Sequence, residues 1–335
     1  MEYQYLFDLN DEKNWINPKK LFRSDGTISE DIHFIHFSLG PESLFRVTDS
    51  VLYPSEMGEI EDCYHHSHHV GFEYFYWLTG TQDYYVNNKK TVLNEPGFFT
   101  LVQPYERHGI VFRSPCRKVG FFHHMPLSAE DNASSALLGH YKPNARSSPD
   151  FPRGDGDSTS VALPLPDTYG CEPPTEYVEL PCEQMSNVKH ISRPMAEFHF
   201  DGVTMKMIIS RWENWGVLEV WGAEMEKGFY AEWNTFPTMT EMYFIADGEV
   251  KFKVYDEEFI AHKECIVKIP RYAEHSIEVL SDTVMYDVAA KTFWFDYLMD
   301  LFSIKKNDPD RYNDKAAMAA LKNKYGCQIK TIGRR

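Results

Sequence analysis

The sequence predicts an all-β protein made of two similar halves, with helices at its C-terminal end. Short strand-like runs follow one another between residues 43 and 125, separated by turn residues and without a long helix. A pattern from this half returns in the second half, and helical patterns take over after residue 291. Many short strands without helices between them favour an antiparallel sandwich or barrel.

The composition limits the size and the partners of the protein. The 335 residues are enough for two domains and a large core. Lys and Arg number 34 against 50 Asp and Glu, and the net charge of −16 argues against nucleic acid or an anionic membrane as a partner. No basic region followed by an apolar run opens the chain, and no stretch approaches the roughly 18 apolar residues of a membrane span. We therefore expect a cytoplasmic protein whose six cysteines, which form no Cys-x-x-Cys motif, stay reduced.

The first half divides into an arm and a run of strands. Residues 1–42 are mixed and polar, and the partly alternating run 32–37 within them is interpreted as an edge strand. Asn87-Asn88-Lys89 is a predicted hairpin turn. The predicted strands between residues 43 and 125 are Leu44–Val47, Phe72–Leu78, Gln82–Val86, Phe98–Val102, Gly109–Phe112 and Lys118–Phe122.

A connection without regular structure is predicted between the two halves. Residues 126–141 can form a short helix with Ser128 as its cap. Eight of the 19 prolines then fall between residues 143 and 181, together with Ser, Asp and Gly. This composition indicates an inter-domain connection.

Helices and a short tail are predicted at the C-terminal end. Residues 292–302 are apolar apart from two aspartates. Asp308-Pro309 is a typical helix start, and this helix is predicted to run to Tyr325 and stop at Gly326. The basic residues 330–335 are predicted to be a solvated tail.

Histidines cluster in the first half. Four of them and Glu73 lie within the nine residues 65–73. Since side chains alternate along a strand, His66 and His68 share one face, and His65 and His69 share the other. Imidazole nitrogen with one carboxylate oxygen suits Fe, Mn, Ni, Cu or Zn. We take His65 and His69 to be surface residues and the other pair to be ligands.

The spacing of these residues resembles the two-part signature of the cupin superfamily. The first part is His-x-His, four residues, Glu, six residues and Gly; the second runs from a Gly through a Pro to a His eleven residues after the Gly. Sixteen residues separate the two parts, a usual length in that family, whereas Gly58 stands seven residues before the first histidine instead of the usual five. The matching residues are His66, His68, Glu73, Gly80, Gly97, Pro104 and His108.

The second half repeats this signature incompletely. Residues 241–248 mirror residues 73–80, and a Pro-containing turn again leads to a histidine, His275. The positions that match the first two histidines hold Asn234 and Phe236. We therefore expect this barrel to hold no metal tightly, and expect Glu241 and His275 to pair with each other.

The resemblance extends to the bicupin dioxygenases related to quercetin 2,3-dioxygenase. It implies two double-stranded β-helix (jelly-roll) barrels in one chain with C-terminal helices. The expected organisation is an arm at 1–42, a metal-binding barrel at 43–125, a helix and proline-rich connection at 126–199, a degenerate barrel at 200–290 and a helical extension at 291–335.

The resemblance also implies a function. The expected metal ligands are His66, His68, Glu73 and His108, with Glu73 also acting on protons. Fe²⁺ is the first expectation, with Mn²⁺, Ni²⁺, Cu²⁺ or Zn²⁺ as alternatives. The expected pocket walls, which are also ordinary core residue types, are Phe75, Trp77, Ile110 and Phe112.

Three activities remain open at this point. The first is a dioxygenase that cleaves a small aromatic or enolic substrate without an organic cofactor. The second is a non-oxidative isomerase, lyase or decarboxylase, and the third is a bicupin that binds a ligand without turnover. The expected partner is a small-molecule substrate, and a homodimer is left open as the assembly.

Overall fold

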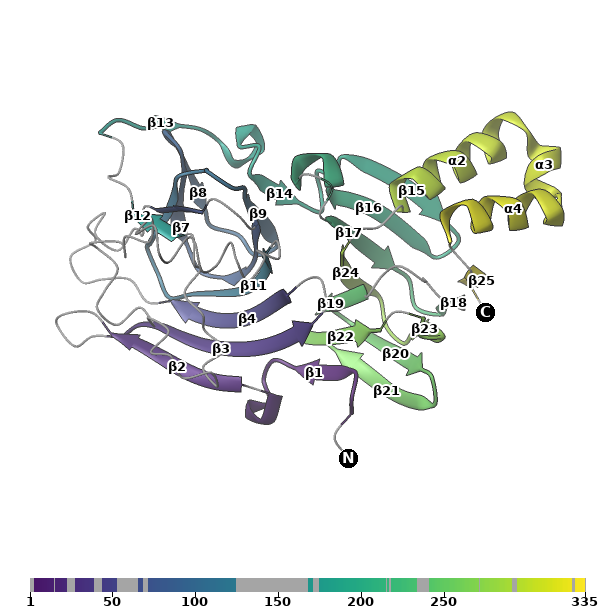
Figure 1. Ribbon diagram of the computed structural model, residues 1–335, viewed down its shortest axis with the longest axis horizontal. Coiled ribbons are helices and arrows are strands. Elements are labelled where there is room, and N and C mark those ends of the chain that lie inside the picture. The colour runs from purple at the N-terminus through teal and green to yellow at the C-terminus, as the bar shows by residue number, and fades with distance from the viewer. Residues whose placement is uncertain are drawn as a thin grey trace, which may run out of the picture. The chain divides into compact units, whose positions relative to one another are not determined.

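The computed structural model describes most of the chain as two compact units (Figure 1). The first unit is Trp15–His190, and the second combines Met1–Asn14 with Ile191–Arg335. The described residues are 3–14, 16–22, 28–38, 44–52, 66–68, 72–124, 168–170, 175–214, 216, 218–233, 241–270, 272–290, 294–326 and 329–334.

Two sheets form the described part of the first unit. One has seven strands in the order β14-β9-β6-β11-β4-β3-β2, and the other has six in the order β12-β5-β10-β7-β8-β13. In Figure 1, strands β7, β8, β9 and β11 curve around the interior of this unit. The strands are β2 Ile16–Phe22, β3 Ile28–Ser38, β4 Leu44–Leu52, β5 His66–His68, β6 Phe72–Thr79, β7 Gln82–Val86, β8 Lys89–Leu93, β9 Phe98–Val102, β10 His108–Phe112, β11 Cys116–His124, β12 Thr168–Gly170, β13 Val178–Glu179 and β14 Val188–His190.

The second unit repeats this arrangement with additions at both ends. Its described sheets have the orders β1-β22-β19-β24-β17-β16-β15 and β21-β20-β23-β18-β25. The strands are β1 Leu6–Asp8, β15 Ala196–Phe200, β16 Val203–Ile209, β17 Leu218–Met225, β18 Phe229–Trp233, β19 Glu241–Asp247, β20 Glu249–Val254, β21 Glu257–His262, β22 Cys265–Ile269, β23 His275–Val279, β24 Thr283–Ala290 and β25 Ile329–Arg334.

The helices lie mainly after the second barrel, as predicted. Helix α2, Trp294–Asn307, supplies apolar side chains to the core of its unit, beside β15 in Figure 1. The predicted single helix from Pro309 to Tyr325 is instead two helices, α3 Pro309–Asn313 and α4 Lys315–Tyr325. They are separate because the Asp314 side chain accepts a hydrogen bond from Ala316 N at 2.8 Å and caps α4. Three short 3₁₀ helices also occur in the described chain: η1 Glu12–Asn14, η3 Cys182–Gln184 and η4 Arg211–Asn214.

Several predicted elements are present with close boundaries. The runs Gln82–Val86 and Phe98–Val102 are strands β7 and β9 without any change of bounds. Asn87 adopts φ 54° in the two-residue turn of the β7–β8 hairpin, a conformation that asparagine tolerates. Strand β8 was not among the predicted strands. The predicted helix capped by Ser128 lies outside the described residues.

The ends of the predicted regions differ from the structure. The predicted arm, residues 1–42, is divided between the two units, because β1 belongs to the second unit and β2 and β3 belong to the first. The predicted edge strand at residues 32–37 was wrong, because β3 lies between β2 and β4 in its sheet. Within 126–199, β12, β13 and β14 pair with strands of the first barrel. The predicted solvated tail was wrong, because Ile329–Arg334 forms β25 and pairs with β18.

A glycine ends the first motif in both units for a steric reason. Gly80 has φ 98°, and a Cβ added to it would lie 2.6 Å from Cys116 Cα. Gly248 has φ 89°, and its Cβ would lie 2.7 Å from Thr283 Cα. The positive φ and the close approach of another strand's backbone both exclude a side chain at these positions. The glycine of the signature is therefore required by backbone packing.

Candidate metal centre

Glu73 and His108 meet in the interior of the first unit. Glu73 lies near the start of β6, and His108 is the first residue of β10. Glu73 Oε2 lies 3.4 Å from His108 Nε2, and the two residues are 6% and 3% exposed. The sequence spacing therefore predicted a pair that the fold brings together.

The imidazole of His108 is oriented by the turn that precedes it. Its Nδ1 lies 3.0 Å from the carbonyl oxygen of Glu106. A carbonyl can only accept, so Nδ1 donates a hydrogen bond to it and Nε2 faces Glu73. The Glu106 carboxylate in turn accepts hydrogen bonds from Gln103 N at 3.0 Å and Asn187 Nδ2 at 2.7 Å. Burial raises the pKa of Glu106, and these two donors oppose the rise.

The backbone of the His-x-His motif lies beside His108. Strand β5 pairs with β10 so that His66 stands directly opposite His108. His68, two residues further along, pairs with Thr168 of β12. The structure describes the backbone of His66 and His68 and not their side chains. His65 and His69 lie outside the described residues.

Aromatic side chains line the interior next to Glu73. Phe75 and Trp77 follow it on the same face of β6, with ring centroids 6.2 Å apart. Trp77 Nε1 donates a hydrogen bond to Thr100 Oγ1 at 3.1 Å, which fixes the indole. Phe112 is buried in the same core cluster, and Ile110 packs against that cluster. All four predicted wall residues therefore lie in one apolar cluster.

Two polar side chains in this interior were missed by the sequence analysis. Tyr84 stands opposite Ile110 in the ladder, on the face that also carries His108. Burial, and then the charges of Glu106 and Glu73, raise the pKa of Tyr84 well above 10, so the phenol stays neutral. The alternation of residues within the predicted strand 82–86 was the signal for its inward position.

Lys118 is the second missed residue. It stands opposite Trp77 in the β6–β11 ladder, and its Nζ lies 4.1 Å from the Phe75 ring centroid and 5.8 Å from that of Trp77. In the described part of the chain, Lys118 makes no ion pair with a carboxylate. A half-buried ammonium group therefore lies against the aromatic walls.

The second unit contains the same Glu–His geometry. Glu241 Oε2 lies 3.4 Å from His275 Nε2, and His275 Nδ1 lies 3.0 Å from the carbonyl oxygen of Ala273. Glu241 is 1% exposed and His275 is 4% exposed. Burial lowers the pKa of His275 to about 4, so this imidazole is neutral at neutral pH. Asn234 and Phe236, at the changed ligand positions, lie outside the described residues.

Two further buried carboxyl groups accompany Glu241. Asp287 stands opposite both Trp221 and Tyr243 in the sheet, and Glu219 lies two residues before Trp221 on the same face. Trp221 Nε1 donates to Glu219 at 2.9 Å, and Tyr243 Oη donates to Glu241 at 3.1 Å. Burial, and then the charges of Glu241 and Glu219, raise the pKa of Asp287 well above its usual value. The sequence analysis missed this group because it compared only the motif positions.

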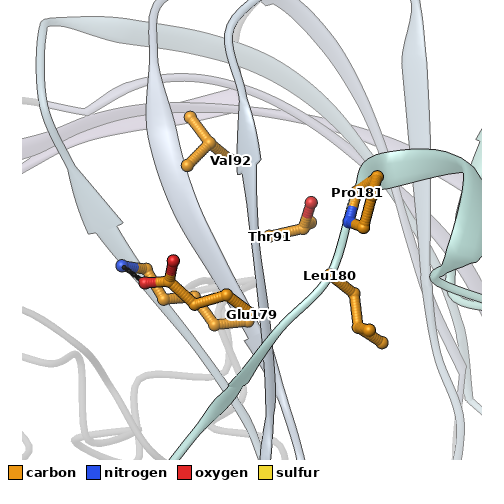
Figure 2. Close-up of a pocket in the computed structure, with 6 residues that line it drawn as sticks. Thr91, Val92, Glu179, Leu180 and Pro181 are labelled. Carbon is orange, nitrogen blue, oxygen red and sulfur yellow. Dashed lines mark hydrogen bonds and ion pairs between the residues drawn. The ribbon is translucent and has the colours of Figure 1, made fainter.

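A surface pocket of about 270 Å³ lies elsewhere in the first unit, between β8 and the segment that contains β13 (Figure 2). Lys90 Nζ and Glu179 Oε1 form an ion pair there at 3.0 Å. No residue of the predicted metal centre lines this pocket. Its lining consists of Lys90, Thr91, Val92, Glu179, Leu180 and Pro181.

No described helix has both the length and the apolar character that crossing a membrane requires.

Comparisons with known proteins identify the fold. No family model and no curated protein matches the sequence. Among solved structures, the Lactobacillus farciminis oxalate decarboxylase formate complex is similar with a TM-score of 0.52 at 12% identity, over 87% of each chain. A structure of the Bacillus subtilis oxalate decarboxylase, from a study of its Mn(II) centres, has a TM-score of 0.51 at 11% identity, over 87% of this chain and 78% of that one. The chain therefore has the all-β fold of two cupin barrels followed by C-terminal helices.

Proposed function

We propose that this chain is a metal-dependent cupin enzyme with its active site in the first barrel. The observation that carries the proposal is the Glu73–His108 pair, in which Nε2 and a carboxylate oxygen face each other at 3.4 Å. Two ligand atoms at about 2.1 Å from one ion and at right angles lie about 3 Å apart, so this pair fits an ion after a small adjustment. His66 and His68 would complete the ligand set, since β5 lies beside β10.

Among the candidate metals for this site, we rank Mn²⁺ above Fe²⁺. A set of imidazole nitrogens and one carboxylate accepts either ion. The Mn(II) centres of the structurally similar Bacillus subtilis enzyme favour manganese. The order of metals from the family resemblance, with iron first, is therefore reversed in this proposal.

For the reaction, we place non-oxidative decarboxylation of a small carboxylic acid first. The similar structures are oxalate decarboxylases, and Lys118 adds a positive charge to the interior that would attract a substrate carboxylate. A bound divalent ion would act as a Lewis acid toward a substrate oxygen. Glu73 can accept or return a proton, and the neutral Tyr84 hydroxyl can donate a hydrogen bond. When the C–C bond to the carboxylate breaks and CO₂ leaves, the electron pair stays on the remaining carbon, which then takes up a proton.

Oxidative cleavage of an aromatic or enolic substrate is the second candidate. The buried walls formed by Phe75, Trp77 and Phe112 favour it, since they suit a flat apolar ring better than a small diacid. The two candidates differ in their need for O₂.

The experiment follows CO₂ release and O₂ uptake by the purified, metal-loaded full chain. Small mono- and dicarboxylic acids are compared with catechols, flavonols and 1,3-diketones, with air and under strict anaerobiosis. If an acid releases CO₂ both with and without O₂, the result supports decarboxylation. If turnover consumes O₂ stoichiometrically, the result supports oxidative cleavage instead. Glu73→Gln should bind metal more weakly and lose more activity than His65→Ala. Absence of both metal and turnover would leave a ligand-binding bicupin.

A further inference from the structure

A group of side chains of metal-ligand types lies in the second unit, at the end of β22 opposite to the one that pairs with Glu241. Asp8, the last residue of β1, stands directly opposite Cys265, the first residue of β22. His262 ends β21, and a tight turn through Glu264, with φ 66°, leads from it to Cys265. Leu9 N donates to the carbonyl oxygen of Glu264 at 3.1 Å and holds the end of β1 against this turn.

The three side chains converge on one point. One potential ligand atom from each lies within 4.8 Å of the other two. His262 Nε2 lies 3.5 Å from Asp8 Oδ2, and Cys265 Sγ lies 3.6 Å from His262 Nδ1. Ligand atoms around a tetrahedral Zn²⁺ with ordinary Zn–N, Zn–O and Zn–S bonds are separated by about 3.3 to 3.6 Å. Asp8 and Cys265 approach different nitrogens of the imidazole, so binding one ion through Nε2 requires the half-exposed His262 ring to rotate toward Sγ.

Hydrogen bonds already orient two of the three groups. Asp8 Oδ1 accepts a hydrogen bond from Asn10 N at 2.9 Å, which leaves Oδ2 turned toward His262. His262 Nδ1 lies 3.0 Å from the carbonyl oxygen of Lys263. A hydrogen on Nδ1 satisfies that carbonyl and leaves the Nε2 lone pair toward Asp8, the second-shell pattern of metal-binding histidines.

The donor types and their exposure favour zinc. A thiolate, an imidazole and a carboxylate together suit Zn²⁺, which binds sulfur, nitrogen and oxygen. The Cys265 side chain is buried. The His262 side chain is 49% exposed, which leaves an open side for entry of the ion and for a water as fourth ligand.

We propose that Asp8, His262 and Cys265 form a zinc site that is separate from both cupin centres. Binding replaces the thiol proton with the ion and releases that proton to solvent. The ion ties β1 to the β21–β22 hairpin, so its role is to fasten this strand to the second barrel.

Cobalt substitution tests the proposal on the full chain. The protein is stripped with a chelator and titrated with Co²⁺, and the near-ultraviolet thiolate-to-cobalt charge-transfer band is recorded. The cupin ligands are nitrogen and oxygen only, so Glu73→Gln should keep the band. Cys265→Ser should abolish it, while Cys182→Ser, in the first unit, should leave it unchanged. No band in the unaltered protein, or a band that persists in Cys265→Ser, overturns the proposal.

A second measurement covers the case in which Cys265→Ser fails to fold. His262→Ala changes a half-exposed side chain and should lower the Zn²⁺ affinity at least tenfold while the circular dichroism spectrum is kept. X-ray absorption of the zinc-loaded His108→Ala protein, in which the first-barrel centre is disabled, should show one sulfur neighbour at about 2.3 Å. The proposal is overturned if zinc has only nitrogen and oxygen neighbours, or if His262→Ala keeps the Zn²⁺ affinity of the unaltered protein. In either case Asp8 and His262 form a simple ion pair.

Discussion

Glu241 and His275 lie 3.4 Å apart through Oε2 and Nε2, and the same two atoms are separated by the same distance in Glu73 and His108. In both units the other ring nitrogen lies 3.0 Å from the carbonyl oxygen two residues earlier. The turn therefore fixes the histidine tautomer in the same way in both barrels. What separates the barrels chemically is the set of side chains around this common pair.

The His-x-His motif should supply two of the four metal ligands in the first barrel. His66→Ala and His68→Ala should each lose most of the bound metal, because each removes a ligand. His65→Ala and His69→Ala are the matched controls and should retain it, since the alternation of side chains along a strand predicts that they point away from the other pair. Metal content after gel filtration measures this. Loss of metal from His65→Ala with retention in His66→Ala would contradict the alternation argument.

The Glu241–His275 pair should hold no ion tightly. A phenylalanine and an asparagine replace the two histidines of the motif, so only two of the four ligand positions keep their residue types. Anomalous scattering on crystals of the metal-loaded protein should show no peak between Glu241 and His275. The position of the peak is decisive here and the metal count is not, because the proposed zinc site lies in the same unit. A peak at the pair would contradict the prediction.

Burial of His275 should make the protein less stable in mild acid. Its pKa falls from 6.5 to about 4 on folding, so between these values the unfolded chain binds a proton that the folded chain does not. Stability from this group is therefore present above pH 6.5 and is lost as the pH falls toward 4, by roughly 3 kcal/mol. Denaturant unfolding of the protein and of His275→Asn across this range measures the difference. His199→Asn, at an exposed histidine, is the control, and equal pH slopes in the protein and His275→Asn would refute the prediction.

Lys118 should matter for an acidic substrate and not for a neutral one. Lys118→Met removes a charge that would contact the substrate carboxylate, so kcat/KM for an acid should fall about 10- to 100-fold, from the roughly 1.5–3 kcal/mol of a charged hydrogen bond. Lys118→Arg should recover part of this loss, and Lys89→Met, at an exposed lysine, should have no effect. Steady-state kinetics with an acid and with its amide make the comparison. An equal loss for both substrates would mean that Lys118 acts through packing.

Gly248 should tolerate alanine less well than Gly228. Both have positive φ, 89° and 86°, so both substitutions carry a similar backbone cost of about 1 kcal/mol. An added Cβ at Gly228 meets nothing within 4 Å, whereas one at Gly248 collides with the backbone of Thr283. Gly248→Ala should therefore lose a further 1 to 3 kcal/mol, roughly. The free energies of unfolding in urea give the difference, and equal losses would show that the close approach relaxes freely.

Local patterns predicted strands such as β7 and β9 and the approach of Glu73 to His108, and non-local pairing accounts for most of what was missed. Strand β7 and the Glu73–His108 pair follow from alternation and from motif spacing, which are visible within short windows. Lys118 was missed because its inward position depends on its register against Trp77 of another strand. The solvated tail was wrong because a basic composition was given more weight than the edge of β18, which pairs with residues 329–334.

Strand β1 has a consequence for the order in which the chain is made. Leu6 pairs with Val267, so a segment that is synthesised before the first unit completes a sheet whose partner strand is synthesised after that unit. At about 5–20 residues per second this delay is on the order of tens of seconds. The first unit, Trp15–His190, can fold in that time, whereas β1 cannot pair until β22 has been synthesised. Cutting the gene between the two barrels would therefore not give two whole domains, because the C-terminal fragment would lack its first strand.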